Sequence, residues 1–248
     1  MLAADGNPPV RADVKRFYKE VGVEEKDEGS FAVTVDGRVV KTPMRAPLVL
    51  PSEALAVAVA QEWDAQRTHI EPLFMPLTKF ASTVLDRYPE VRDKVTNNLV
   101  KYLASDSLAF RNHNPGSLAA LQHKKWDPVV EWVGQNHGVV LDVTDGLMPS
   151  HPAQSAEALR KYLDALDDWQ LVGFDRIAAS TRSVTLSLAL TEGHLSPEQT
   201  LALSRLEEEF QTGVWGVVEG GHDIDETVAM VDLTATDVYL RILQLSQP

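Results

Sequence analysis

The hydrophobic pattern of this chain changes period near residue 75, and that change limits the folds it can adopt. Between residues 31 and 35 apolar and small or polar side chains alternate, as they do in a half-buried strand. Beyond Pro72 and Pro76 the apolar residues recur every three or four positions, which is typical of helices. The sequence therefore predicts an α+β fold, with a small N-terminal sheet-plus-helix domain over residues 1–75 and a larger mainly helical domain over 76–248.

The N-terminal part contains a short-range signal for paired strands. Asp36-Gly37 lies between two apolar runs, and this dipeptide favours the turn of a β-hairpin. Residues 48–50 can add a third short strand. Pro51-Ser52 then opens an Ala-rich helix that continues through residue 66, with Trp63 on its inward face.

In the helical part, prolines and glycines are expected to mark the ends of helices. We expect Pro89 to separate two helices, Pro128 to kink or end a third and Gly173 to close a fourth. Residues 175–190 alternate in part like a strand. We interpret them as helical, because a lone strand among helices would leave its backbone groups unpaired.

A helix is predicted from Ser196 to the glycine pair at 220–221. Ser196 and Gln199 have the spacing of a capping box, and Pro197 suits the first helical turn. One stripe of this helix is apolar and is expected to face the core. Its members are Leu203, Leu206, Phe210, Val214 and Val217.

A second side of the same predicted helix combines an aromatic residue with acids. At about 100° per residue, Glu208, Trp215 and Glu219 fall away from the apolar stripe, and His222-Asp223 follows at the corner to the next helix. These five residues form the predicted partner-binding site. The alternative is a helix buried on two sides, with Glu219 paired to an interior arginine, and the sequence leaves both possibilities open.

Composition excludes several classes of function. The chain has 23 Lys and Arg against 36 Asp and Glu, a net charge of −13, which argues against nucleic-acid binding and against binding to anionic membranes. There is no cysteine, so disulfides, thiolate nucleophiles and Cys-ligated zinc are excluded. We find no apolar window of membrane-spanning length and no secretory or transit pattern at the start. A cytoplasmic location is expected, although a processed organelle protein would look similar.

The usual signatures of nucleotide-binding, hydrolase and metalloprotease chemistry are missing from the sequence. The remaining enzyme hypothesis is a metal-dependent phosphohydrolase centred on His222-Asp223, because imidazole and carboxylate are the ligands such a site needs. His151 and His194 are the histidines that would have to complete it. We expect no catalytic residue, no metal and no cofactor, since no spacing in the sequence brings these groups together.

A set of longer strings carries a family resemblance. They are RFYKEV, VDGRVVKTP, LPSEALAVAVAQEWDAQ, EPLFMPLTKFASTVLD, YLASDSLAFR, WDPVVEW, LDDWQLVGF and SRLEEEFQTGVWGVVEGGHD, in this order from about residue 16 to residue 223. Each string is modest alone, but their order and spacing are specific. With them the chain resembles the assembly chaperones for the alpha subunit of the F-type ATP synthase, which occur in mitochondria and in some bacteria.

The resemblance implies an ATP-independent chaperone that holds the free alpha subunit until the beta subunit replaces it. It implies a small α+β domain before a larger helical one, and no catalytic residue. It also implies a functional carboxylate in the segment that matches the family pattern here, which is Glu219, with Trp215, His222 and Asp223 as neighbours. The expected protein is a monomer and a bacterial member, located in the cytoplasm, or in the mitochondrial matrix if it is a processed eukaryotic member.

Overall fold

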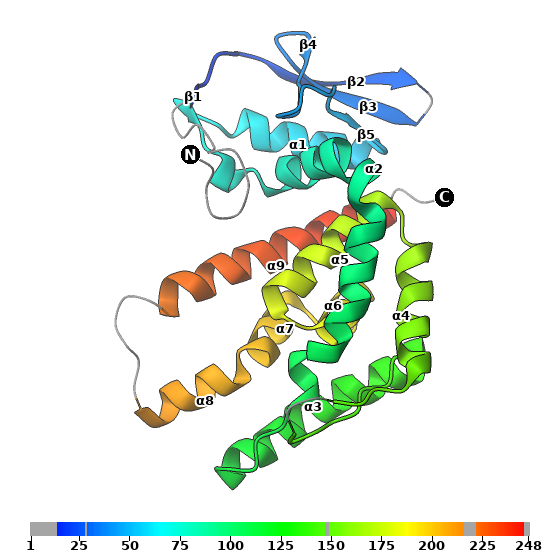
Figure 1. Ribbon diagram of the computed structural model, residues 1–248. Coiled ribbons are helices and arrows are strands. Elements are labelled where there is room, and N and C mark those ends of the chain that lie inside the picture. Colours follow the sequence, from blue (N-terminus) through cyan, green and yellow to red (C-terminus); the bar gives the residue numbers. More distant parts are fainter. Residues whose placement is uncertain (1–13, 28, 147–148, 216–221, 246–248) are drawn as a thin grey trace, which may run out of the picture. The chain divides into compact units, whose positions relative to one another are not determined.

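The computed structural model describes residues 14–27, 29–146, 149–215 and 222–245 (Figure 1). By contacts, the chain divides into a first unit of residues 1–89 with 241–248, and a second unit of residues 90–240. The first unit contains the sheet and the second is helical, which confirms the predicted α+β fold class. The boundary predicted between residues 75 and 76 falls at the start of a helix that runs on through the division at residue 89, and it stays a prediction about folding domains.

The sheet of the first unit is an antiparallel hairpin with two short additions. Strands β2 (Val21–Asp27) and β3 (Ser30–Val35) pair antiparallel with Val23 opposite Val33, and the register shifts between Glu25 and Asp27. On its other edge β3 pairs with β4 (Arg38–Val39) and β5 (Val49–Leu50). Asp36 and Gly37 make the β3–β4 turn at positive φ, which confirms the hairpin predicted from that dipeptide.

Helix α1 (Glu53–Asp64) covers one face of this sheet and forms most of the core of the first unit with it (Figure 1). Ser52 caps the helix by accepting a hydrogen bond from the Leu55 amide at 3.3 Å, as the sequence predicts. The core between sheet and helix is aliphatic because β-branched strand residues meet the helix stripe at spacing four. It consists of Val33, Val35, Leu48, Leu50, Leu55 and Val59.

A two-stranded ribbon, which the sequence analysis missed, pairs a segment that precedes the main sheet with a segment that follows α1. Strand β1 (Val14–Lys15) pairs with β6 (His69–Ile70), so that Lys15 lies opposite His69. A 3₁₀ turn, η1 (Pro72–Phe74), follows directly. Two residues per strand are too few to show a period-two pattern in the sequence.

Helix α2 (Pro76–Tyr102) is continuous, and the prediction that Pro89 separates two helices is wrong. Proline removes one helical hydrogen bond and costs about 3 kcal/mol inside a helix. The helix tolerates that cost because buried apolar side chains lie on both sides of the proline. Phe80, Val84 and Tyr88 precede it, and Leu99 follows it.

The second unit contains two short 3₁₀ turns and a set of helices. They are η2 (Leu103–Ser105), η3 (Ser107–Ala109), α3 (Gly116–His137), α4 (Ala153–Ala165), α5 (Asp168–Thr181), α6 (Val184–Thr191), α7 (Pro197–Ser204), α8 (Leu206–Trp215) and α9 (His222–Leu245). The helical interpretation of residues 175–190 is confirmed by α5 and α6. Residues 184–190 of α6 are all buried, so this helix is the centre of the unit and has no polar side to reveal a period.

Asp106 supports the start of this central helix from inside the protein. Its fully buried carboxylate accepts four hydrogen bonds, from the Ser183 hydroxyl at 2.8 Å, the Thr185 amide and hydroxyl at 2.9 Å and the Leu108 amide at 3.0 Å. Burial raises the pKa of Asp106, while these donors act to lower it. The N-terminus of α6 is therefore held by a carboxylate from a distant part of the sequence.

The prediction that Gly173 closes a helix is also wrong, and of the two outcomes predicted for Pro128, a kink or a helix end, the helix end is excluded. Pro128 lies inside α3, and Gly173 lies inside α5 where a Cβ atom would come within 2.7 Å of Leu240 Cδ2. Glycine is at position 173 because the side chain of α9 packs against the backbone of α5 there, and its function is not to end a helix.

The predicted late helix is divided in two at Arg205. The Ser196–Gln199 capping box is confirmed at the start of α7. At the other end the Leu203 carbonyl accepts a hydrogen bond from the Trp126 indole at 3.0 Å instead of from the next helical turn, and Arg205 takes a non-helical conformation. This exchange of partners explains why α8 begins anew at Leu206.

Candidate docking site

The predicted binding residues lie at the adjoining ends of α8 and α9. Trp215 is the last residue of α8, and His222 and Asp223 open α9. Glu219 and its neighbours at 216–221 lie outside the described residues, as do the side chains of Trp215, His222 and Asp223. The shared accessible face of the Trp215 indole and the Glu219 carboxylate therefore stays a prediction.

Glu208 is the one predicted residue whose side chain the structure describes. It is partly exposed in the first turn of α8 and accepts from Arg205 Nη2 at 2.6 Å. An i,i+3 pair of this kind contributes only a few tenths of a kcal/mol. The pair orients the Glu208 carboxylate without removing it from the surface.

The neighbouring acids of α8 have different partners. Glu207 turns toward the interior, where one oxygen accepts from the amides of Asn112 and Gln122, each at 2.6 Å. The pKa of the exposed Glu209 is raised, first by partial burial and then by the carboxylate of Glu226, with smaller effects of Arg205 and Glu208. Because Glu226 belongs to the first turns of α9, α8 and α9 bring like charges together.

The charge of this region is uniform in sign. Between residues 206 and 240 the sequence has nine Asp and Glu and no Lys or Arg. We call residues 206–240 the acidic segment. Arg205 and Arg176, which lie outside the segment, pair with Glu208 and Asp232. The segment itself has nine acids and no Lys or Arg, so its net charge favours a cationic partner.

Helix α9 also presents apolar side chains to solvent. Val228, Val231 and Val238 are 53%, 54% and 44% exposed. At about 100° per residue they fall within one narrow stripe, opposite the face on which Leu233 and Leu240 are buried. We call these three residues the valine stripe. An exposed stripe beside acids is the surface composition expected of an interaction site.

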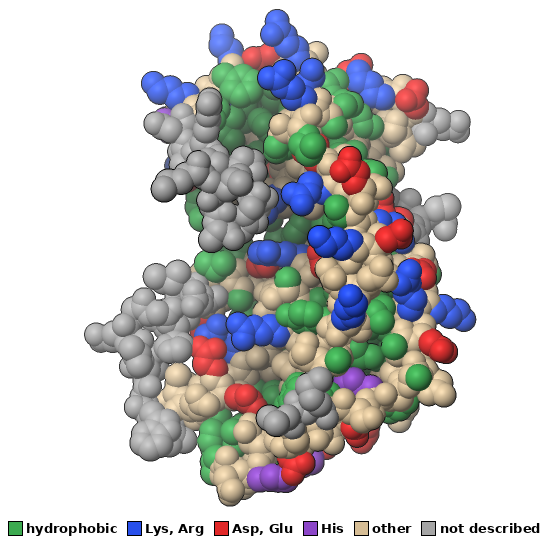
Figure 2. Space-filling view, viewed as in Figure 1, with side chains coloured by type: hydrophobic (Ala, Val, Ile, Leu, Met, Phe, Trp, Pro, Cys, Tyr) green, Lys and Arg blue, Asp and Glu red, His purple; other side chains and the backbone are tan. Residues whose placement is uncertain are grey.

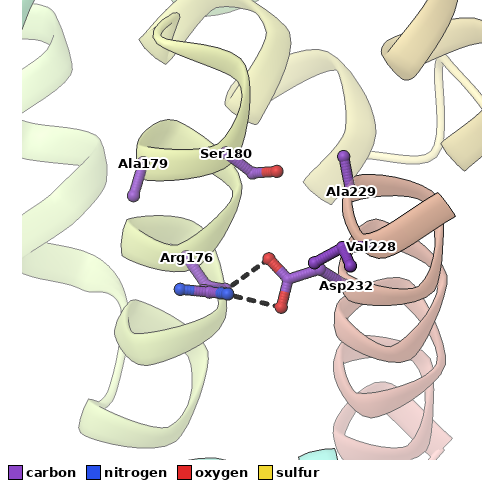
Figure 3. Close-up of a pocket in the computed structure, with 6 residues that line it drawn as sticks. All are labelled: Arg176, Ala179, Ser180, Val228, Ala229 and Asp232. Carbon is purple, nitrogen blue, oxygen red and sulfur yellow. Dashed lines mark hydrogen bonds and ion pairs between the residues drawn. The ribbon is translucent and has the colours of Figure 1, made fainter. Parts of the chain in front are cut away.

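A shallow recess of about 250 Å³ adjoins the valine stripe, between α5 and α9 (Figure 3). Arg176, Ala179 and Ser180 of α5 and Val228, Ala229 and Asp232 of α9 line it. Arg176 Nε contacts both carboxylate oxygens of Asp232, at 2.8 and 2.6 Å, and so ties the two helices together. The recess is thus bordered by this ion pair, and its other lining residues are small and, apart from Ser180, apolar.

The two histidines that would have to complete a metal site at His222-Asp223 have other partners. His151 Nδ1 accepts from the Asp142 amide at 2.9 Å, and its Nε2 lies 2.9 Å from the Leu103 carbonyl. His194 stacks on Trp132 with ring centroids 4.1 Å apart. In the part of the chain that the structure describes, no three His, Asp or Glu side chains gather as a metal would require.

Sequence reasoning named Glu208 of α8 but missed the valine stripe and the Arg176–Asp232 pair. The valines are separated by three and seven residues among other apolar residues of α9, so their exposure depends on which face the bundle covers. One signal was available, because the absence of Lys and Arg across 35 residues is visible in the sequence.

The comparisons with known proteins place the chain in a family. A family model described as ATP12 chaperone protein matches residues 15–134. The crystal structure of Atp12 from Paracoccus denitrificans superimposes with a TM-score of 0.87 at 30% sequence identity, over 92% of this chain and 98% of that one. The chain belongs to the ATP12 chaperone family. The resemblance drawn above from ordered sequence strings is therefore confirmed.

Two further similar proteins support the same placement. Protein atp12, mitochondrial, of Schizosaccharomyces pombe is 26% identical over 251 residues, which cover 96% of this chain and 86% of that protein. A putative chaperone from Agrobacterium tumefaciens matches with a TM-score of 0.85 at 30% identity, over 93% of this chain and 86% of its own. The family thus includes mitochondrial and bacterial proteins. Among the described helices, none is long and apolar enough to cross a membrane.

Proposed function

We propose that this protein is an ATP-independent assembly chaperone that binds the free alpha subunit of F-type ATP synthase and holds it for the beta subunit. The observation that carries the proposal is membership of the ATP12 chaperone family over almost the whole chain. A subunit separated from its neighbours exposes surface that aggregates unless it is covered. A chaperone of this kind needs an exposed docking surface, and it needs no catalytic group.

The acidic segment is the proposed docking surface. It combines the valine stripe with carboxylates such as Glu208 and Glu226, so it fits a client surface that is apolar at its centre and basic around it. A partly polar contact of this kind binds firmly yet allows exchange when the permanent partner arrives. Trp215, Glu219, His222 and Asp223 lie within the same segment and stay predicted members of the contact.

The remaining parts of the proposal follow the family. We propose a monomer without cofactor and without membrane insertion, acting in the cytoplasm of a bacterium, or in the mitochondrial matrix if the protein is a processed eukaryotic member. The relatives include both settings, since one is named as mitochondrial and another comes from Paracoccus denitrificans.

The test is suppression of aggregation of isolated alpha subunit by the full-length chain, followed by light scattering after dilution from denaturant. We expect suppression without ATP, and release of the alpha subunit when the beta subunit is added. If the chain did not suppress the aggregation of isolated alpha subunit, the proposed client would be wrong.

Variants locate the docking surface. Val231→Lys places a cation on the valine stripe and should weaken capture of the alpha subunit about tenfold, and Glu219→Lys should act in the same direction. Val140→Lys is the matched control, because Val140 is a similarly exposed valine of the second unit outside the acidic segment. Equal loss in all three variants would remove the acidic segment as the docking surface.

A further inference from the structure

The β1–β6 ribbon of the first unit borders a second, larger recess of about 530 Å³. Lys15 of β1 lines it together with Arg16 and Tyr18, which follow β1 in sequence. His69 of β6 lines it together with Arg67 and Thr68, which precede β6. We call it the ribbon recess. Figure 2 shows basic side chains and a histidine at the edge of the first unit, where Figure 1 places β1.

The floor of the ribbon recess is held rigidly. The guanidinium of Arg16 lies over the Tyr18 ring, 4.7 Å from its centroid, and donates to the carbonyls of Asp64, at 2.9 Å, and Gln66. Tyr18 is buried, and its hydroxyl donates to the Trp63 carbonyl at 2.6 Å. These contacts fasten the recess to the end of α1, so it keeps its shape without a ligand.

The rim of the recess has two exposed cations that are not in ion pairs with other described residues. Lys15 and Arg67 are exposed, and neither forms an ion pair with another residue of the described chain. Arg16 also faces the recess, but it is already paired with Asp64 at 3.2 Å. Glu71 is the exposed acid that follows the ribbon most closely in sequence. The local charge therefore favours an anionic ligand.

Large apolar side chains are exposed shortly after each strand of the ribbon in sequence. Phe17, two residues after β1, is 67% exposed, and its ring meets Tyr18 edge-on with centroids 5.3 Å apart. Leu73 and Phe74, in the turn directly after β6, are 76% and 65% exposed. An aromatic ring is a costly group to leave in water, and it anchors contacts well because it has few rotatable bonds.

The charge of the first unit supports a ligand different from that of the acidic segment. Residues 1–89 with 241–248 hold 12 Lys and Arg and 13 Asp and Glu, a net −1, whereas residues 90–240 hold 11 and 23, a net −12. Nearly all of the negative charge of the chain thus belongs to the second unit. An anionic ligand repelled by the second unit meets no such repulsion at the ribbon recess.

We propose that the ribbon recess is a second docking surface, which binds an extended acidic and apolar segment of the client polypeptide. Its carboxylates pair with Lys15 and Arg67, and its apolar side chains pack on Phe17, Leu73 and Phe74. The inference rests on the proposed function, because the client is the same free alpha subunit. Two surfaces of opposite preference let one chaperone hold a client at both a basic and an acidic region.

Site-specific crosslinking tests this surface directly. Benzoylphenylalanine replaces Phe17 or Leu73 in the full chain, which is then irradiated with isolated alpha subunit, and the crosslinked peptides are identified by mass spectrometry. Val57, an exposed valine of α1 in the same unit, is the control position. We expect crosslinks from positions 17 and 73 to client peptides rich in Asp or Glu, and few from position 57.

Charge variants give the second measurement. The pair Lys15→Glu with Arg67→Glu should weaken alpha-subunit binding about tenfold and reduce the crosslink from position 17, whereas Lys15→Arg with Arg67→Lys should keep both. Capture of the alpha subunit with no crosslink and no effect of charge reversal would overturn this proposal and leave the proposed function standing. Failure of the parent chain to capture the alpha subunit would overturn both. Crosslinks to a second copy of this chain would replace the proposal with self-association.

Discussion

Each unit uses a carboxylate from another element to hold the start of a helix, and the two carboxylates differ in burial. In the first unit Glu62 of α1 accepts from the Leu77 amide and from the Thr78 amide and hydroxyl, all at 2.7 Å, at the start of α2. In the second unit Asp106 does the same for α6 from a fully buried position. Glu62 keeps part of its surface in water.

The difference shows how burial determines how much stability is lost when an otherwise similar carboxylate is removed. A carboxylate near solvent can be replaced by water when its hydrogen bonds are broken, so its loss is moderate. A carboxylate sealed in the core leaves buried donors with no other partner, so its loss is severe. The unit that contains the acidic segment therefore depends on one interior acid, while its surface acids contribute little to stability.

The largest expected effect comes from Asp106→Ala. Removal of the carboxylate leaves the Thr185 amide and the hydroxyls of Ser183 and Thr185 buried without their acceptor, and should lower the free energy of unfolding by about 3–5 kcal/mol. Urea denaturation followed by circular dichroism measures the change. Asp164→Ala removes an exposed i,i+4 partner of Arg160 and should cost less than about 0.5 kcal/mol. Similar losses for both variants would break the comparison.

A pair of glycines tests whether the acidic segment is packed as tightly as the helices behind it. A Cβ atom at Gly173 of α5 would meet Leu240 Cδ2 at 2.7 Å, so Gly173→Ala should destabilise the protein by about 2 kcal/mol. At Gly213 of α8 no atom lies within 4 Å of the added carbon, so Gly213→Ala should stabilise it by about 0.5–1 kcal/mol. Midpoints of urea unfolding measure both changes. Destabilisation by Gly213→Ala would show that α8 is packed more closely than the structure describes.

The same two glycines show what the sequence could and could not predict. The capping box at Ser196 and the Asp36-Gly37 turn depend on neighbours in sequence, so they were predicted correctly. Gly173 was misread as a helix end, because its reason is a side chain 67 residues away. Pro89 was misread in the same way, since burial on both sides of it outweighs its local cost.

The same distinction between local features and tertiary contacts applies to the candidate sites. Glu208 of α8 could be picked out from the sequence because charge and helical spacing are local properties. The ribbon recess was not, because Lys15 and His69 meet only when two strands of two residues pair across 54 positions. Exposure of the valine stripe likewise depends on which face of α9 the other helices cover. The sequence therefore shows which side chains are available, but it does not show which of them tertiary contacts bring together or leave exposed.

Glu62→Gln should cost less than Asp106→Ala or Gly173→Ala, about 1 kcal/mol at neutral pH, because it keeps the shape of the side chain but cannot accept all three hydrogen bonds. Its pH dependence sharpens the comparison. Burial raises the pKa of Glu62 above its ordinary 4.5, although the donors from Thr78 and Leu77 act to lower it. A carboxyl whose pKa is higher in the folded than in the unfolded state contributes stability below its unfolded pKa, and that contribution is lost as the pH rises through the folded pKa. The stability difference between the parent and Glu62→Gln should therefore decrease as the pH is raised from below 4.5.

Urea unfolding of both proteins across this range isolates Glu62, because their other titrating groups are the same. If the difference instead grew with pH, the hydrogen bonds would outweigh the burial of the charge. The half-exposed carboxylate of the first unit would then differ from the sealed one of the second in the direction of its pKa shift as well as in the cost of its loss.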